Sequence, residues 1–280
     1  MKIPQKRIHK FLRHGKKFPH VWCPGCSNGT VLGAIIRAVG ELGYEKDDMA
    51  MVSGIGCSSR MPVYVDFNTL HTLHGRAIPF ATGIKMVKPH MNVCVVTGDG
   101  DSSAIGGNHL IHAARRNIDL TVIVINNNIY GMTGGQYSPT TPTGDRATTT
   151  QYGNIDPVFD LCKLVQGAGA TFVARTTAYH VVEAQALIKQ AFAHKGFSLV
   201  EVVSACPVIY GRLNKKGSAP MMLKDMKERA IPFEAFAKLP AEKTEGKYPR
   251  GVMVNIDQPE YTQRYAELIQ SLQEKQGDKK

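Results

Sequence analysis

Long apolar runs are missing from this 280-residue chain, and with them any pattern that would place it in a membrane. A membrane-spanning helix needs ~20 consecutive, mostly apolar residues, and no run here approaches that length. The first eighteen residues carry seven lysines and arginines but no apolar segment of the kind that secretory signals contain. We therefore expect a cytoplasmic protein without membrane contact.

Acidic residues are also scarce: 23 aspartates and glutamates stand against 34 lysines and arginines, a formal net charge of +11. A basic balance is one mark of nucleic-acid binding. However, the basic stretches lack interleaved aromatic residues and contain no recognisable nucleic-acid-binding module, so we expect no nucleic-acid partner. An acidic partner protein or a bound anionic cofactor would also balance the charge.

The apolar residues that are present form short runs typical of buried strands. Four such runs are nearly continuous in apolar residues, which indicates parallel strands covered on both faces; they are Met49–Ser53, Val93–Thr97, Leu120–Ile125 and Ser198–Val203. Helix-like stretches alternate with them at Gly29–Leu42, Ile78–Val87, Ala104–Arg116, Val158–Val165 and Tyr179–Ala193. This order predicts an α/β fold with a doubly wound, mostly parallel sheet.

The chain divides into three parts by composition. A basic N-terminal arm at 1–20 precedes a main domain at 21–210, and a C-terminal extension follows at 211–280. The extension begins with a basic, turn-forming stretch and then contains helix-like segments at 221–229 and 261–274. Within the main domain, residues 126–156 form a long polar segment, and loops of such length are usually functional or disordered.

Each strand-like run leads into residues that can carry chemistry. Ligands of open α/β sheets bind outside the carboxyl ends of the strands, so residues that follow different strands meet there. The four endings are Gly54-Ile-Gly-Cys57, Gly98-Asp-Gly-Asp101, Asn126-Asn-Asn128 and Cys206-Pro207. We therefore expect one site, of the kind found in a cofactor enzyme.

Six cysteines are present, and four of them stand in patterns that suit a metal centre. Cys94 and Cys162 lie in a predicted strand and a predicted helix, where core packing explains them. The other four comprise a C-x-x-C knuckle and two isolated residues: Cys23, Cys26, Cys57 and Cys206. Four thiolates suit zinc or a [4Fe–4S] cluster, and the knuckle alone would also suit a redox dithiol. Because zinc sites usually take two close pairs, the spacing favours the cluster.

Gly98-Asp99-Gly100 and Asn127 fit a second kind of site. Asp99 and Asn127 lie 28 residues apart, at the ends of consecutive predicted strands joined by a helix. The side-chain oxygens of Asp99 and Asn127 suit Mg²⁺, and the glycines and the following helix start would admit a phosphate. Alone, each motif could be a turn or a strand cap. Together they match the thiamine diphosphate motif.

Cluster cysteines and a thiamine diphosphate motif in one chain resemble the β subunits of 2-oxoacid:ferredoxin oxidoreductases. The resemblance covers most of residues 20–210. It runs through Trp22-Cys-Pro-Gly-Cys26, Gly54-Ile-Gly-Cys-Ser-Ser59, His74-Gly-Arg76, Gly98-Asp-Gly-Asp101, the stretch Asn126–Gln136 and Cys206-Pro207. The stretch Tyr210–Gly217 is more similar to the 2-oxoglutarate branch of this family than to the pyruvate branch.

The resemblance implies a role for each matching residue. The cluster would be held by Cys23, Cys26, Cys57 and Cys206, and Mg²⁺ by the side chains of Asp99 and Asn127 and the carbonyl of Ile129. The thiamine diphosphate would be lined by Ile55, Gly56, Cys57, Ser58, Gly100, Asp101, Gly131 and Met132. Arg60 stands where the family places a basic residue near the substrate carboxylate. His74 and Arg76 are either site residues or structural groups.

The implied activity is the oxidative decarboxylation of a 2-oxoacid to its coenzyme A thioester, with electrons passing through the cluster to ferredoxin, or the reverse reaction. The best match is 2-oxoglutarate. No glutamate here stands in a motif for activating the cofactor's aminopyrimidine. In this family the α subunit supplies it, so we expect a heterodimer or a dimer of heterodimers. The alternatives are a pyruvate or other 2-oxoacid enzyme, or a non-redox thiamine diphosphate decarboxylase subunit with structural zinc.

Overall fold

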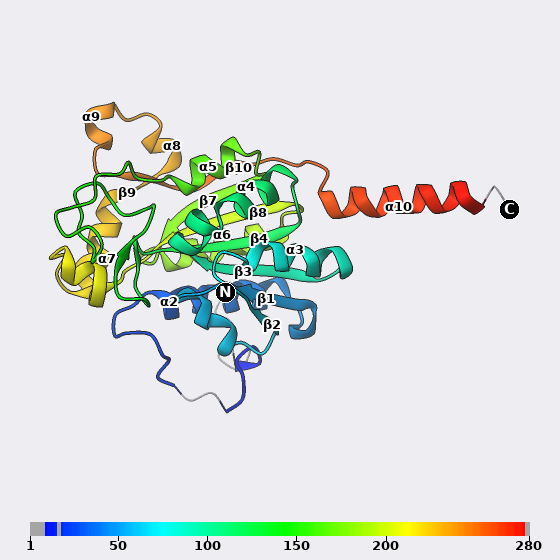
Figure 1. The fold of residues 1–280 in the computed structure, drawn as a ribbon, viewed down its shortest axis with the longest axis horizontal. Helices are drawn as coiled ribbons and strands as arrows, with labels where there is room; N and C mark the ends of the chain where they lie inside the picture. Colours follow the sequence, from blue (N-terminus) through cyan, green and yellow to red (C-terminus); the bar gives the residue numbers. More distant parts are fainter. Residues whose placement is uncertain (1–8, 16–17, 278–280) are drawn as a thin grey trace.

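A computed structural model of the chain describes residues 9–15 and 18–277 (Figure 1). Residues 1–8 and 16–17 of the predicted basic arm, and the last three residues of the extension, lie outside the described residues.

The centre of the fold is an eight-stranded sheet in the order β2-β1-β3-β4-β8-β7-β10-β9. Every neighbouring pair is parallel except β10 with β7, which is antiparallel. In that order the strands are Asn68–His71, Met49–Ser53, Asn92–Gly98, Leu120–Asn126, Phe197–Val203, Phe172–Thr177, Tyr248–Asn255 and Ala230–Pro232. A separate hairpin joins β5 (Ile129–Tyr130) to β6 (Gln136–Tyr137). The predicted doubly wound, mostly parallel sheet is confirmed.

Helices cover both faces of the sheet (Figure 1). One face packs against α2 (Asn28–Leu42) and α6 (Val181–Ala193), the other against α3 (Ala77–Val87), α4 (Gly107–Arg115) and α5 (Leu161–Gly167). Side chains of a strand point alternately to opposite faces, so Ile123 and Ile125 of β4 join the first core and Val122 and Val124 the second. This double covering explains why the central strands read as continuous apolar runs.

Two predicted helices begin three residues later than expected, at Gly107 and Leu161. The stretch expected to be one helix from Ala104 is a π-helical turn, Asp101–Ile105, followed by α4. The helix expected from Val158 begins at Leu161, because the side chain of Asp160 caps it by accepting a hydrogen bond from the Lys163 backbone nitrogen at 3.2 Å.

The C-terminal extension is partly continuous with the sheet. It contains α7 (Ala219–Arg229), β9, the short helices α8 (Phe233–Phe236) and α9 (Ala241–Thr244), β10 and α10 (Tyr261–Gly277). β10 returns to pair with β7, whereas α10 projects away from the body (Figure 1). Among the described residues no helix, α10 included, has both the length and the apolar character that crossing a membrane requires.

Candidate cofactor and metal site

The four strand endings that carry chemistry meet at one edge of the sheet. β1, β3, β4 and β8 are consecutive neighbours and run parallel, so their carboxyl ends lie side by side. Beyond these ends the Ser204 backbone nitrogen still donates to the Asn126 carbonyl at 2.7 Å. The predicted convergence of the endings is confirmed.

Asp99 is the buried centre of this edge, with 2 % of its surface exposed. Its Oδ2 accepts hydrogen bonds from the hydroxyls of Ser138 at 2.5 Å and Thr140 at 2.7 Å, and its Oδ1 from the Asn127 backbone at 3.4 Å. Burial raises the pKa of the Asp99 carboxyl, and these donors partly oppose the shift. A cation at this carboxylate would offset the desolvation of its charge, so the residue fits a metal ligand.

Residues 126–129 form a tight loop that leaves β4 beside Asp99. Asn128 adopts a left-handed backbone with φ of 62°, a conformation that asparagine tolerates better than most residues. The Asn127 side-chain oxygen accepts from the Ile129 backbone nitrogen at 3.3 Å. The structure therefore brings together the three residues assigned to magnesium, Asp99, Asn127 and Ile129.

Gly100 gives the backbone room next to this loop. A Cβ placed on Gly100 would overlap the ring of Tyr130, whose hydroxyl donates to the Gly100 carbonyl at 2.9 Å. The backbone of the turn that follows β3 therefore packs directly against the Tyr130 ring of β5.

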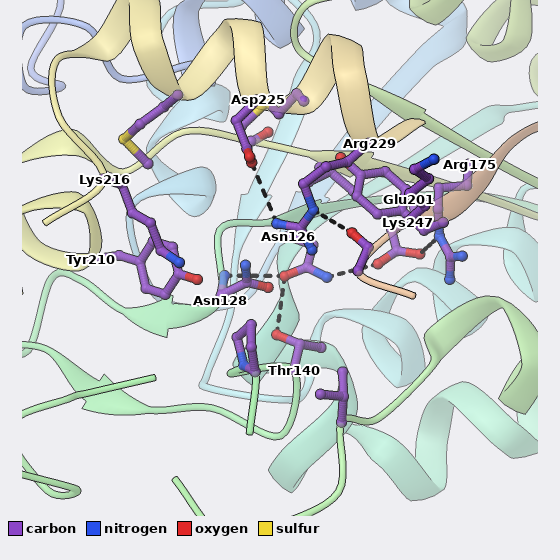
Figure 2. A pocket seen from close by; sticks show the side chains of 18 of the residues that line it. Asn126, Asn128, Thr140, Arg175, Glu201, Tyr210, Lys216, Asp225, Arg229 and Lys247 are labelled. Atoms are coloured by element: carbon purple, nitrogen blue, oxygen red, sulfur yellow. Dashed lines mark hydrogen bonds and ion pairs between the residues drawn. The ribbon is translucent and has the colours of Figure 1, made fainter. Parts of the chain in front are cut away.

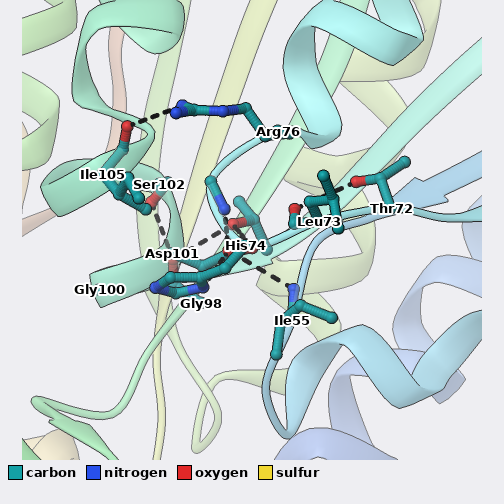
Figure 3. Close-up of polar contacts among 12 residues, drawn as sticks. Ile55, Thr72, Leu73, His74, Arg76, Gly98, Gly100, Asp101, Ser102 and Ile105 are labelled. Atoms are coloured by element: carbon teal, nitrogen blue, oxygen red, sulfur yellow. Dashed lines mark hydrogen bonds and ion pairs between the residues drawn. The ribbon is translucent and has the colours of Figure 1, made fainter.

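Asp101, which the resemblance assigns to the cofactor, is bonded chiefly to the protein itself (Figure 3). Its Oδ1 accepts from the Gly75 backbone at 2.6 Å, and its Oδ2 accepts from the Thr97 hydroxyl at 2.8 Å. Nδ1 of His74 lies 2.7 Å from Oδ1, an ion-pair distance, although the alignment is poor for a hydrogen bond. Asp101 thus links the turn at Gly75, which follows β2, to β3, and the His74 ring lies beside it.

The remaining predicted site residues lie around this edge. Arg60 lies, half-buried, in the 3-10 helix Ser58–Val63 that follows Cys57. The Arg76 guanidinium contacts the Ile105 carbonyl at 3.2 Å (Figure 3) and His109 Nε2 on α4 at 2.9 Å. Ile55 and Met132 expose their side chains.

The four cysteines also gather at this edge. A Cβ placed on Gly131 would lie 3.6 Å from Cys206 Sγ and 3.9 Å from Cys57 Sγ, so both sulfurs face the loop that follows Ile129. Burial, together with the nearby Cys26, Cys206 and Cys23, raises the pKa of the Cys57 thiol to about 11. All four thiols are therefore close enough to affect one another. Cys94 and Cys162 are buried in the core, as expected.

A hydrogen bond from Trp22 ties the knuckle to Cys57, and another closes the knuckle itself. The Trp22 indole nitrogen donates to the Cys57 carbonyl at 2.6 Å, and the Cys26 backbone nitrogen donates to the Cys23 carbonyl at 3.0 Å. Asn28 Nδ2 lies 3.1 Å from Cys26 Sγ, a donor suited to a thiolate. The chain thus places a closed turn of two cysteines beside the end of β1.

The spacing of these sulfurs bears on the choice of metal. Four sulfurs at about 2.3 Å from one zinc ion lie about 3.8 Å apart in a tetrahedron. Within the described residues, no three of the four cysteine sulfurs lie within 4.8 Å of one another. The sulfurs are thus spread more widely than they would be around a single zinc ion.

Several functional residues escaped the sequence analysis. Ser138 and Thr140, which donate to Asp99, lie in the polar segment 126–156, where nothing local marks them. Glu201 lies in the middle of β8, where it accepts from Asn126 and Arg175 (Figure 2). A lone charged residue inside an otherwise apolar strand was the signal for it. Thr140 and Glu201 border a cavity of about 660 Å³ beyond the ends of β4, β7 and β8.

The fold and this site define a thiamine diphosphate-dependent enzyme. Residues 54–202 match the family model described as the thiamine pyrophosphate enzyme, C-terminal TPP binding domain. These residues include both parts of the Gly98-Asp-Gly and Asn126-Asn-Asn motif.

Comparison with whole proteins narrows the class. The chain is 49% identical over 263 residues to 2-oxoglutarate synthase subunit KorB of Methanocaldococcus jannaschii, covering 94% of this chain and 97% of the relative. It is 58% identical over 189 residues to the KorB subunit of Archaeoglobus fulgidus, covering 68% and 70%. A solved structure of 2-oxoglutarate:ferredoxin oxidoreductase from Magnetococcus marinus superposes with a TM-score of 0.85 at 35% identity, over 97% of this chain and 92% of that chain.

The chain belongs to the family of KorB-type β subunits of 2-oxoacid:ferredoxin oxidoreductases. The resemblance inferred from its motifs is thereby confirmed, as is the class of enzyme. None of these relatives is named as a nucleic-acid-binding protein or as a non-redox decarboxylase, the two other classes considered above.

We expect Gly100→Ala to weaken thiamine diphosphate binding strongly, because the new methyl group would push Tyr130 and the 129–131 loop away from β3. Gly83→Ala is the matched control: Gly83 lies exposed within α3, with no atom within 4 Å of the added Cβ. That change should leave binding unaltered and stabilise the fold by about 0.5–1 kcal/mol. Calorimetric titration with thiamine diphosphate and thermal unfolding measure both effects. Equal affinity in the two variants would contradict the close approach described here.

Proposed function

We propose that this chain is the cofactor-binding and cluster-binding subunit of an enzyme that converts 2-oxoglutarate and coenzyme A to succinyl-CoA and CO₂ while two electrons pass to ferredoxin, or catalyses the reverse reaction. The observation that carries the proposal is the meeting, at one sheet edge, of the buried Asp99 site and the thiols of Cys57 and Cys206 beside Gly131, with Cys23 and Cys26 near Cys57. The Magnetococcus marinus enzyme was solved with 2-oxoglutarate, coenzyme A and succinyl-CoA bound, which supports the choice of substrates.

Asp99, Asn127 and Ile129 would hold Mg²⁺ against the diphosphate. A buried carboxylate, an amide oxygen and a backbone carbonyl are hard oxygen donors of the type that magnesium takes. Residues Ile55, Gly56, Ser58, Gly100, Asp101, Gly131 and Met132 would surround the rest of the cofactor. In this arrangement Asp101 acts from behind, since its carboxylate holds the loops that carry Ile55 and Gly75.

Cys23, Cys26, Cys57 and Cys206 would hold a [4Fe–4S] cluster. The wide spacing of their sulfurs supports this assignment over zinc. Cys57 belongs to both sites, because it is a cluster ligand that directly follows the cofactor-lining pair Ile55 and Gly56. Electrons would therefore cross only a short distance between the two groups.

Bound thiamine diphosphate supplies a ring that accepts the electron pair left when CO₂ departs, and the cluster accepts electrons one at a time. The residues of this chain bind and orient the reactants. The Arg60 guanidinium would pair with a substrate carboxylate. His74, whose Nδ1 lies 2.7 Å from Asp101 Oδ1, would hold or release a proton at Nε2.

The chain would act together with an α subunit that supplies the missing glutamate. Apolar side chains exposed beside the site support a covering partner: Leu73 and Ile105 flank His74 and Arg76 (Figure 3), with 68% and 50% of their surfaces exposed. Ferredoxin would be the electron acceptor, and the net charge of +11 would favour an acidic protein of this kind. We place the enzyme in the cytoplasm, where its free cysteines would stay reduced.

The test is to co-express the chain with its α subunit, purify the complex anaerobically, and measure metal content and turnover. We expect about four irons and four sulfides per β chain and a broad absorbance near ~400 nm. Coenzyme A-dependent ferredoxin reduction should be faster with 2-oxoglutarate than with pyruvate. A complex that holds zinc and no iron would refute the redox assignment, and a preference for pyruvate would refute the substrate.

Asn127→Ala should lower the affinity for Mg²⁺ and thiamine diphosphate by at least about tenfold, because even changes to groups behind a metal ligand cost that much. The iron content and the cluster spectrum should stay unchanged. Gln270→Ala, which removes an exposed amide from α10, is the control. Loss of iron from Asn127→Ala would show that the two sites are not separate.

Cys206→Ser should deplete the cluster and abolish electron transfer to ferredoxin. The affinity for thiamine diphosphate should fall by less than about tenfold, which is the lower end of the loss typical of changes around a metal ligand. Iron analysis and calorimetric titration give the two readouts. Cys94→Ser is the matched control, since Cys94 is a buried core cysteine on β3 outside the proposed cluster. Full iron content in Cys206→Ser would remove Cys206 from the ligand set.

A further inference from the structure

Glu201 is a buried carboxylate to which the proposed chemistry gives no task. It lies at the middle of β8, with 2 % of its surface exposed, between β4 and β7. A buried charge is costly unless it is paired and hydrogen-bonded. Its partners are Arg175 Nε at 2.6 Å and Asn126 Nδ2 at 2.7 Å (Figure 2), and Cys162 Sγ at 3.3 Å.

The two oxygens of Glu201 have different partners. Oε2 accepts from Arg175 and Cys162, whereas Oε1 accepts from Asn126. Arg175 has a second carboxylate partner in Asp160, at 2.5 Å, so the guanidinium does not depend on Glu201 alone. The Asn126 amide has no such second acceptor for its Nδ2 among the described contacts.

Because a carboxylate only accepts hydrogen bonds, Glu201 decides which way the Asn126 amide faces. With Nδ2 turned to Glu201, the Asn126 Oδ1 faces the opposite side. There it accepts from the Asn128 backbone nitrogen at 3.1 Å and lies 3.0 Å from the Thr140 hydroxyl. The same hydroxyl lies 2.7 Å from Asp99 Oδ2, so its single proton is shared between the two acceptors.

This orientation shapes the loop that presents the magnesium ligands. The bond from Asn128 to the Asn126 side chain closes a turn of the kind that asparagine forms with the backbone two residues ahead of itself. Asn127 lies inside this turn and Ile129 directly follows it. If the Asn126 amide were reversed, its NH₂ group would face the Asn128 N–H, two donors would meet, and the turn would open.

We propose that Glu201 is a positioning residue for the magnesium site: it fixes the Asn126 amide, which in turn holds the loop carrying Asn127 and Ile129. This inference rests on the proposed function, because it assumes that the loop binds Mg²⁺ and thiamine diphosphate. Groups that orient metal ligands from behind typically change metal affinity by about 10–100-fold when they are altered.

Glu201→Gln tests the inference with little change of shape. The new NH₂ group must face a donor, either Arg175 Nε or Asn126 Nδ2. Reversing the Asn126 amide relieves the second clash and opens the turn. We expect the Mg²⁺ concentration for half-maximal thiamine diphosphate binding to rise about 10–100-fold, with iron content and kcat at saturating Mg²⁺ near those of the unaltered complex.

The double variant Glu201→Gln with Asn126→Asp exchanges the donor and the acceptor and keeps the net charge. The introduced glutamine would then donate to one oxygen of the introduced aspartate, whose other oxygen would accept from the Asn128 backbone. We expect the Mg²⁺ concentration for half-maximal thiamine diphosphate binding to rise in this double variant by much less than the tenfold typical of a disturbed metal site. Asn126→Asp alone sets two carboxylates against each other and is impaired. This second comparison carries the test should Glu201→Gln alone not accumulate as folded protein.

All variants are measured as full chains in complex with the α subunit. Mg²⁺ is titrated at a fixed concentration of thiamine diphosphate, and cofactor binding is followed by the quenching of the protein's intrinsic fluorescence. An unchanged Mg²⁺ dependence in Glu201→Gln, or a double variant no better than either single variant, would overturn the inference. Failure of the unaltered complex to bind Mg²⁺ and thiamine diphosphate would instead overturn the proposed function. The two failures are therefore distinguishable.

Discussion

A carboxylate enclosed between the ends of two parallel strands is the constraint on which the rest of this site depends. Asp99 is buried, so it must be supplied with donors or a cation. The long segment after β4 turns back over the sheet edge and delivers the Ser138 and Thr140 hydroxyls to Oδ2. The position of that segment over the sheet edge follows from satisfying this one group.

The fold was predictable from the sequence where strands are buried on both faces. β1, β3, β4 and β8 have continuous apolar runs because two layers of helices cover them. β7 was missed because Arg175, Thr176 and Thr177 make its second half polar, although all three are buried and Arg175 is held by ion pairs. β2 lies at the sheet edge, and β10 enters from the far end of the chain; neither position leaves a local pattern.

The candidate site was predictable where residues follow strands, because the topology of a parallel sheet carries such endings to one edge. Asp99, Asn127, Cys57 and Cys206 were placed in this way. The partners that hold them were not. Thr140 reaches Asp99 across 41 residues and Glu201 reaches Asn126 across 75, and only the folded chain shows which of many polar residues fill these positions. For Asp101 the motif predicted a cofactor contact, but in the structure its carboxylate accepts hydrogen bonds from Gly75 and Thr97 of the protein itself.

The projecting helix α10 is anchored to the body at its N-terminal end and is exposed toward its C-terminal end. Glu260 accepts from the Thr262 backbone nitrogen at 2.7 Å, and the Tyr261 backbone nitrogen donates to the Asn117 carbonyl at 3.1 Å, so the first turn is anchored to the body. Farther out, Leu268, Ile269 and Leu272 expose their side chains, and a helix of 17 residues is marginal in water when nothing packs on it. The free energy of opening therefore falls along its length. In the isolated chain, amide hydrogens near Leu272 should exchange with solvent long before those near Tyr261, so that the helix unwinds from its tip while the sheet remains intact.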